Sequence, residues 1–134
     1  MNKTVKNVVS TKDRIIEAAD NLFYERGYEH TSFADIADEV KISRGNFYHH
    51  FKTKDDILVA VISNRMSKTK QMLKDWEEQS SDPEGRIHCF IHILIANYAK
   101  IKLYGCPVGT LSTELVKLDH VSKKEANQIF TLFR

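Results

Sequence analysis

The sequence has few of the residues that interrupt helices or cross-link small domains. Only two prolines and five glycines occur in 134 residues, and we find no convincing strand alternation or hairpin dipeptide. The two cysteines, Cys89 and Cys106, are too few for a disulfide framework, and no cluster of ligand-type residues beside them indicates a zinc module. The sequence therefore predicts an all-α chain that needs no disulfide, metal or other cofactor.

An excess of charge of one sign and long apolar runs are also missing. Twenty Lys and Arg against eighteen Asp and Glu leave a net charge of +2, so affinity for nucleic acid would have to come from a local cluster. No uninterrupted apolar segment reaches about 18 residues, the length of a membrane-spanning helix. The N-terminal segment MNKTVKNVVSTKD lacks the apolar core of a secretory signal. We expect a cytoplasmic protein with no membrane partner.

Helix start signals recur along the chain. Ser10, Ser32 and Thr53 each precede an aspartate by three residues, and Ser43 precedes a short apolar-periodic segment. A hydroxyl at this position accepts a hydrogen bond from a free backbone amide, and the acid favours the positive end of the helix. Together with Asp82-Pro83, Gly105 and Cys106-Pro107, these signals predict seven helices, at about 11–26, 33–40, 44–51, 54–79, 83–103, 107–118 and 119–134.

The predicted helices divide into two parts near residue 55. Residues 1–55 would form a small three-helix head, and residues 56–134 a helical regulatory body. The last six residues, Ile129 to Arg134, include four large apolar side chains and no stop signal. We therefore expect the body to be incomplete at its C-terminal end.

The second and third helices have the layout of a helix-turn-helix, with a tight turn at Lys41 and Ile42. The segment 41–54 holds four basic residues, two histidines and no acid, whereas acids are frequent in the rest of the head. Phe47 and Phe51 are expected to point inward. The outward side chains of the third helix would then be Arg44, Gly45, Asn46, Tyr48, His49 and His50.

These outward residues suit contacts with DNA. In the major groove Arg44 can pair with guanine and Asn46 with adenine, and Gly45 would let the backbone approach a base closely. Contacts with DNA at or beside the recognition helix are expected from Ser43, Tyr48, His49, His50 and Lys54, and from Thr31 and Ser32 at the start of the second helix. The alternative is a solvated polar face over a small helical core.

Two segments resemble a known family. ISRGNFYHHFKTKDDIL, residues 42–58, and TSFADIADEV, residues 31–40, are similar to the DNA-binding domain of the TetR family of bacterial transcriptional regulators. This resemblance implies a homodimer with a helix-turn-helix on each subunit, a palindromic operator in double-stranded DNA, and a C-terminal helical domain that binds a small effector. We expect a repressor that the effector releases from DNA.

The body contains candidates for an effector site. His88 and His92 lie four residues apart beside Cys89, but the further ligands that a metal needs are missing, so these histidines are expected in the core or lining a pocket. In the family's architecture the helix at 83–103 passes the effector pocket, which implies His92, Asn97 and Tyr98 as polar anchors.

Cys106, also assigned to this pocket, stands where a helix begins. Free amides at that position favour a thiolate. The alternative function is therefore a redox or electrophile sensor switched through Cys106, and the plainer reading is a small packed side chain. No motif for a nucleophile, a phosphate loop or paired carboxylates is present, and we do not expect an enzyme.

Overall fold

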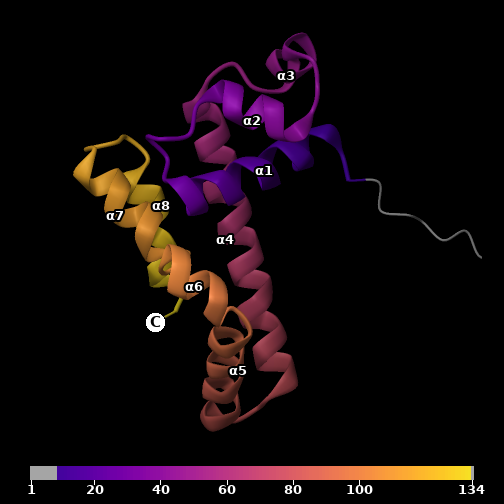
Figure 1. The fold of residues 1–134 in the computed structure, drawn as a ribbon. Helices are drawn as coiled ribbons and strands as arrows, with labels where there is room; N and C mark the ends of the chain where they lie inside the picture. The colour runs from indigo at the N-terminus through magenta and orange to yellow at the C-terminus, as the bar shows by residue number, and fades with distance from the viewer. Residues whose placement is uncertain (1–8, 134) are drawn as a thin grey trace, which may run out of the picture.

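The computed structural model describes residues 9–133, and within them it contains eight α-helices and no strand (Figure 1). The all-α prediction is confirmed. The helices are α1 (Thr11–Arg26), α2 (Phe33–Val40), α3 (Arg44–His50), α4 (Lys54–Gln79), α5 (Pro83–Ala96), α6 (Tyr98–Tyr104), α7 (Gly109–Lys117) and α8 (Lys123–Thr131).

The start signals predicted for α1 to α4 are real helix caps, whereas α7 and α8 begin at Gly109 and Lys123, later than the starts predicted at 107 and 119. The hydroxyl of Ser10 accepts the backbone N–H of Asp13, and those of Ser43 and Thr53 accept the amides three residues further on. Ser32 and Asp35 form a reciprocal capping box. Each cap satisfies an amide that has no partner inside its helix, so α1 to α4 begin where the sequence places them.

The head consists of α1, α2 and α3 packed on the first turns of α4, at the top of Figure 1. The apolar stripes predicted for these helices meet in one core. Its most buried side chains include Ile15 of α1, Ile36 of α2, Phe47 of α3 and Leu58 of α4, which have no exposed surface. This core fixes the direction in which α3 presents its outer face.

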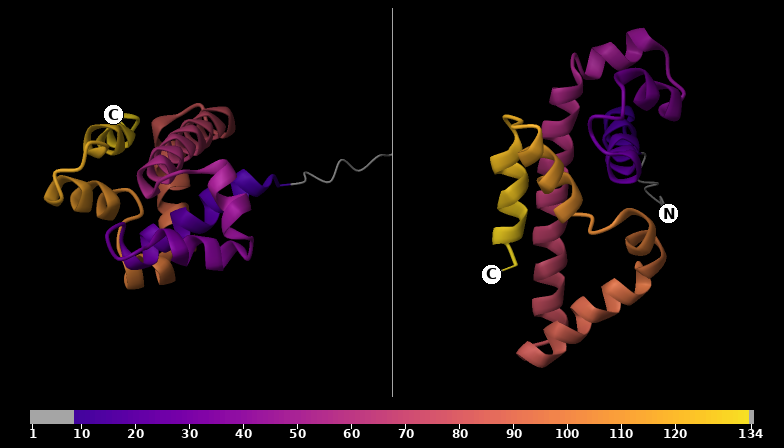
Figure 2. Two further views of the ribbon diagram at one scale, coloured as in Figure 1. Left: turned by 90° about the horizontal axis from the view of Figure 1, so that it is seen from above. Right: turned by 60° about the vertical axis from the view of Figure 1, so that its left-hand side comes forward.

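The long helix α4 connects the head to the body. Figure 2 shows α8 running beside α4, and α7 lying between α8 and the end of α1. Leu111 and Leu115 of α7 and Ala126 of α8 belong to the same apolar cluster as the head. The core is therefore continuous from the head into α7 and α8, and the domain boundary at residue 55 stays a prediction.

The structure corrects the expected helix at 83–103, which is broken at Asn97. The backbone of Asn97 leaves the helical region (φ −104°, ψ 12°). Its side-chain amide and its backbone N–H both donate to the carbonyl oxygen of Ile93, at 2.9 and 3.0 Å. A short polar side chain that bonds its own backbone competes with helix continuation, so α6 starts anew at Tyr98.

His88 and His92 were expected in the core or lining a pocket, and the structure excludes the core, since both are exposed. No side chain of α5 is fully buried, because α5 leaves the lower end of α4 at an angle (Figure 2). Its Phe90 meets Trp76 edge to face at a centroid distance of 6.2 Å. No described helix is long and apolar enough to cross a membrane.

Candidate nucleic-acid interface

The helix α3 is held against the head by one buried residue. Phe47 is fully buried and meets the ring of Phe33 edge to face at 4.4 Å, and Phe33 also stacks on Tyr48 at 5.0 Å. Before α3, Lys41 ends α2 in the left-handed conformation (φ 59°), which turns the chain sharply. The outer face of α3 is thus fixed by packing on one side and by a tight turn on the other.

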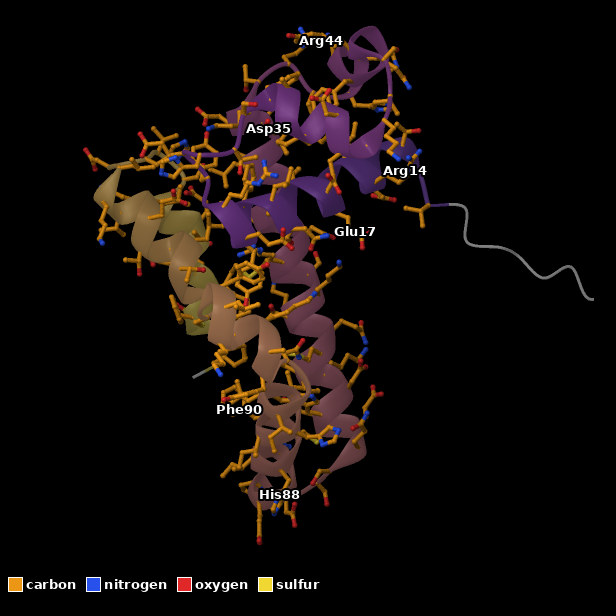
Figure 3. The ribbon with its side chains drawn as sticks, viewed as in Figure 1. Arg14, Glu17, Asp35, Arg44, His88 and Phe90 are labelled. Atoms are coloured by element: carbon orange, nitrogen blue, oxygen red, sulfur yellow. The ribbon has the colours of Figure 1, made fainter. Side chains whose placement is uncertain are left out.

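The outward face of α3 contains the residues that the sequence predicted. Arg44, Gly45, Asn46, Tyr48 and His49 are exposed, and His50 is half-buried. Figure 3 shows Arg44 at the outer end of the head, away from the body. Nothing lies within 4 Å of the position that a Cβ on Gly45 would take, so another molecule can approach the backbone there.

Three basic residues in and beside α3 form no ion pair among the described residues. They are Lys41, Arg44 and Lys52. By contrast, Asp35 on α2 lies 4.0 Å from Arg26. Uncompensated cations beside an exposed helix attract phosphates.

The structure moves Thr31 out of this interface. Its side chain is fully buried. Its hydroxyl lies 2.8 Å from the carbonyl oxygen of Gly27 and 3.3 Å from that of Leu22, and can donate to either. A buried hydroxyl has no surface from which to reach a phosphate, so the phosphate contact expected for Thr31 is wrong. Thr31 instead closes the turn between α1 and α2.

Lys54 has a partner inside the protein as well. Its ammonium donates to the carbonyl oxygen of Tyr28 at 2.9 Å and lies 4.1 Å from the centre of the Tyr28 ring. An ammonium has three donors, so a phosphate contact by Lys54 stays a prediction. Ser32 and Ser43 are exposed helix caps.

The sequence did not indicate that Lys12 lies near the end of α3. Its ammonium lies 5.8 Å from the ring of Phe51, at the end of α3, although it belongs to the first turn of α1. This proximity arises from the packing of α1 in the head, and no local pattern in the sequence indicates it.

The four residues predicted for an effector pocket are not brought together. Cys106 is exposed and lines a groove of about 640 Å³ between the end of α1 and α6–α7, together with Tyr24, Tyr104 and Glu114. His92 on α5, Asn97 between α5 and α6, and Tyr98 on α6 are exposed and do not line this groove. The thiol of Cys106 accepts the backbone N–H of Gly109, the first residue of α7, at 3.4 Å.

A polar cluster at the α1–α2 turn joins the head to the body. The hydroxyl of Tyr28 donates to Asp55, and His120 Nε2 lies 2.8 Å from the same carboxylate oxygen. The hydrogen bond from Tyr28, and after it the bond with His120, hold the pKa of Asp55 below its ordinary value. Burial raises the pKa of the Tyr28 hydroxyl.

The family of bacterial regulatory proteins named for tetR matches residues 15–61, which run from α1 into α4. A TetR transcriptional regulator from Legionella pneumophila, whose crystal structure is known, has 32% sequence identity and a TM-score of 0.80. The match covers 94% of this chain and 68% of that one. This chain belongs to the TetR family. The matched region contains the helix-turn-helix of α2 and α3 from which the resemblance came.

Other relatives support the same assignment. An HTH-type transcriptional regulator in the lacX 3′ region of Lactococcus lactis is 34% identical over 129 residues, which are 95% of this chain and 66% of that protein. The HTH-type transcriptional repressor DhaR of Mycobacterium sp. is 27% identical over 120 residues, with 59% of its length covered. The chain thus spans between about half and two thirds of the curated TetR-family relatives it matches.

Proposed function

We propose that this TetR-family chain represses transcription by binding a palindromic operator as a homodimer, and that a small effector releases it. The observation that carries the proposal is the outer face of α3, which is basic, free of acids and fixed by Phe47. The relative named as a repressor, DhaR, supports the direction of regulation.

The residue roles follow from position on α3. Arg44 and Asn46 lie in its first turn and would read base edges, Arg44 at guanine and Asn46 at adenine. Gly45, between them, would let the backbone approach a base. Tyr48 and the histidines His49 and His50 would face the sugar-phosphate chain, with Ser32, Ser43 and Lys54 at the edges of the interface.

In a dimer, the two α3 helices would enter successive major grooves about 34 to 36 Å apart. The head, residues 1–55, would bind DNA, and the body, residues 56–134, would respond to the effector. Release requires an effector that binds more tightly to the state whose α3 spacing no longer fits the operator.

The groove lined by Cys106 is one place where an effector would act, because it lies between α1 of the head and α7 of the body. His92, Asn97 and Tyr98 would belong to a separate surface of α5 and α6. A redox or electrophile sensor remains the alternative for this chain, supported by the exposure of Cys106 beside the head.

The experiment compares base-reading and phosphate-binding substitutions on duplexes that the unsubstituted chain selects from a randomised pool. We expect Arg44→Ala and Asn46→Ala to cost about 1–3 kcal/mol of binding free energy each on the selected sequence, and to relax the preference for it. Lys52 is a cation beside α3 that forms no ion pair among the described residues. Lys52→Ala should weaken binding to all sequences alike and reduce the salt dependence. An unchanged ranking of sequences after Arg44→Ala and Asn46→Ala would refute the assignment of α3 as the reading helix.

A further inference from the structure

The turn that joins α1 to α2 is bound from the body by one side chain of α7. Glu114 Oε1 accepts the backbone N–H of Tyr28 at 2.6 Å, and Oε2 accepts that of Glu29 at 3.2 Å. Hydrogen bonds to an ionised carboxylate are about twice as strong as neutral ones, and two of them in parallel also fix an orientation. Glu114 is separated from this turn by 85 residues or more along the chain.

Two carbonyl groups of the turn also accept hydrogen bonds from side chains. The hydroxyl of Thr31 donates to the Gly27 carbonyl from within the head, and the ammonium of Lys54 donates to the Tyr28 carbonyl from the start of α4. The two amides that face the body would have no protein partner without Glu114.

Gly27 permits this approach of α7. Its φ of 85° is a conformation that favours glycine, and a Cβ there would lie 3.0 Å from Glu114 Oε2. The sequence therefore provides both the conformation that turns the amides toward α7 and the space for the carboxylate.

A second contact lies on the same side. His120, in the turn after α7, bonds Asp55 at the start of α4, and its ring meets that of Tyr28 edge to face at 5.2 Å. The α1–α2 turn and the beginning of α4 are thus both attached to α7 and the turn that follows it.

We propose that Glu114 is a positioning residue for DNA binding: by holding the amides of Tyr28 and Glu29 it fixes the angle between the head and the body, and so the direction of α3. This inference rests on the proposed function. The head is covalently continuous with the body through α4, and the apolar core that runs into α7 and α8 also joins them. The Glu114 contact adds a directional attachment on the side of α7, between one side chain and two backbone amides.

The groove lined by Tyr24, Tyr104 and Cys106 is also lined by Glu114. Any movement of α7 at this groove therefore acts directly on the contact with the head. N–H···O hydrogen bonds in proteins usually span about 2.7–3.2 Å, so a shift of α7 by about 1 Å away from the turn would lengthen both bonds beyond that range.

The test uses the full chain and three variants: Glu114→Ala, Glu114→Gln and Glu78→Ala. Glutamine keeps the length of the side chain and one acceptor oxygen. Glu78 is an exposed acid near the end of α4, and its variant controls for the loss of one negative charge. Helix content by circular dichroism checks that each variant is folded.

Amide exchange and residual dipolar couplings measure the contact and the angle. In Glu114→Ala we expect the amide hydrogens of Tyr28 and Glu29 to exchange about tenfold faster or more. We also expect the residual dipolar couplings of α1–α3 to fit a changed orientation of the head relative to α4, α7 and α8, or an average over several orientations. Glu114→Gln should show a smaller change, and Glu78→Ala none. A single unchanged orientation in folded Glu114→Ala would overturn the proposal.

Binding to selected duplexes links the angle to function. For Glu114→Ala we expect unchanged affinity for a duplex with one half-site, and about tenfold weaker binding to two half-sites at their selected spacing. A merely unfolded head would lose both. Equal affinity for the paired half-sites would overturn the positioning role. Failure of the unsubstituted chain to select any duplex would refute the proposed function, while the exchange and coupling data would still decide whether Glu114 sets the angle.

Discussion

Replacing Gly45 by alanine is expected to make the protein more stable and its complex with DNA weaker. Gly45 lies in the first turn of α3 with an ordinary helical backbone, since the positive-φ glycines among the described residues are Gly27 and Gly105. A Cβ at Gly45 meets nothing within 4 Å. Alanine therefore adds no strain, and its helix propensity and smaller unfolded-state entropy should raise the free energy of unfolding by about 0.5–1 kcal/mol.

In the complex the same methyl group would occupy space that the DNA needs. If the backbone at Gly45 lies against a base edge, we expect at least about tenfold weaker binding, or about 1.4 kcal/mol. Urea denaturation gives the stability, and fluorescence anisotropy with a selected duplex gives the affinity. Ser67→Ala on the exposed side of α4 is the matched control, with a similar gain in helix propensity and no effect on DNA binding. Unchanged or tighter binding by Gly45→Ala would refute the close approach.

Two further predictions concern the α1–α2 turn and the start of α4 that bonds to it. Thr31→Val removes a buried donor to the Gly27 carbonyl and should cost about 1–3 kcal/mol of stability. The salt dependence of DNA binding should not change in Thr31→Val. A reduced salt dependence would show that Thr31 contributes to the contact with DNA phosphates. Hydrogen bonds from Tyr28 and His120 lower the pKa of Asp55 in the folded state below its unfolded-state value of 3.8. The ionised carboxylate therefore stabilises the fold above pH 3.8, and this stabilisation is lost as the pH falls through the lower folded-state pKa. Urea denaturation at about pH 6 and about pH 3 should therefore show less acid destabilisation in Asp55→Asn than in the unsubstituted chain, and equal destabilisation would contradict the reasoning.

Much of the head could be predicted from the sequence because its signals are local. A serine or threonine with an acid three residues later forms a cap by contacts within one turn, and the structure has such caps at Ser10, Ser32 and Thr53. The spacing of Phe47 against the polar residues around it was enough to find the outer face of α3. Local signals of this kind need no knowledge of distant segments.

The parts that failed depend on tertiary contacts or on a single competing hydrogen bond. Thr31 reads as a polar residue at a helix start, and only the fold of the turn buries it. Asn97 lies in an apolar helical pattern, and its side chain ends α5 by bonding Ile93. Glu114 has no neighbour in the sequence that indicates a role, because its partners Tyr28 and Glu29 come from the other end of the chain.

The most direct test of the central claim is a titration of the chain with a selected duplex at about 50 mM and about 200 mM salt. Three lysines flank α3, namely Lys41, Lys52 and Lys54. If each head neutralises about three phosphates, the affinity of one head should fall about 40-fold between the two salt concentrations. A steep fall of this size, reduced in Lys52→Ala, is the result that our account predicts. Absent binding, or binding that does not change with salt, would contradict it.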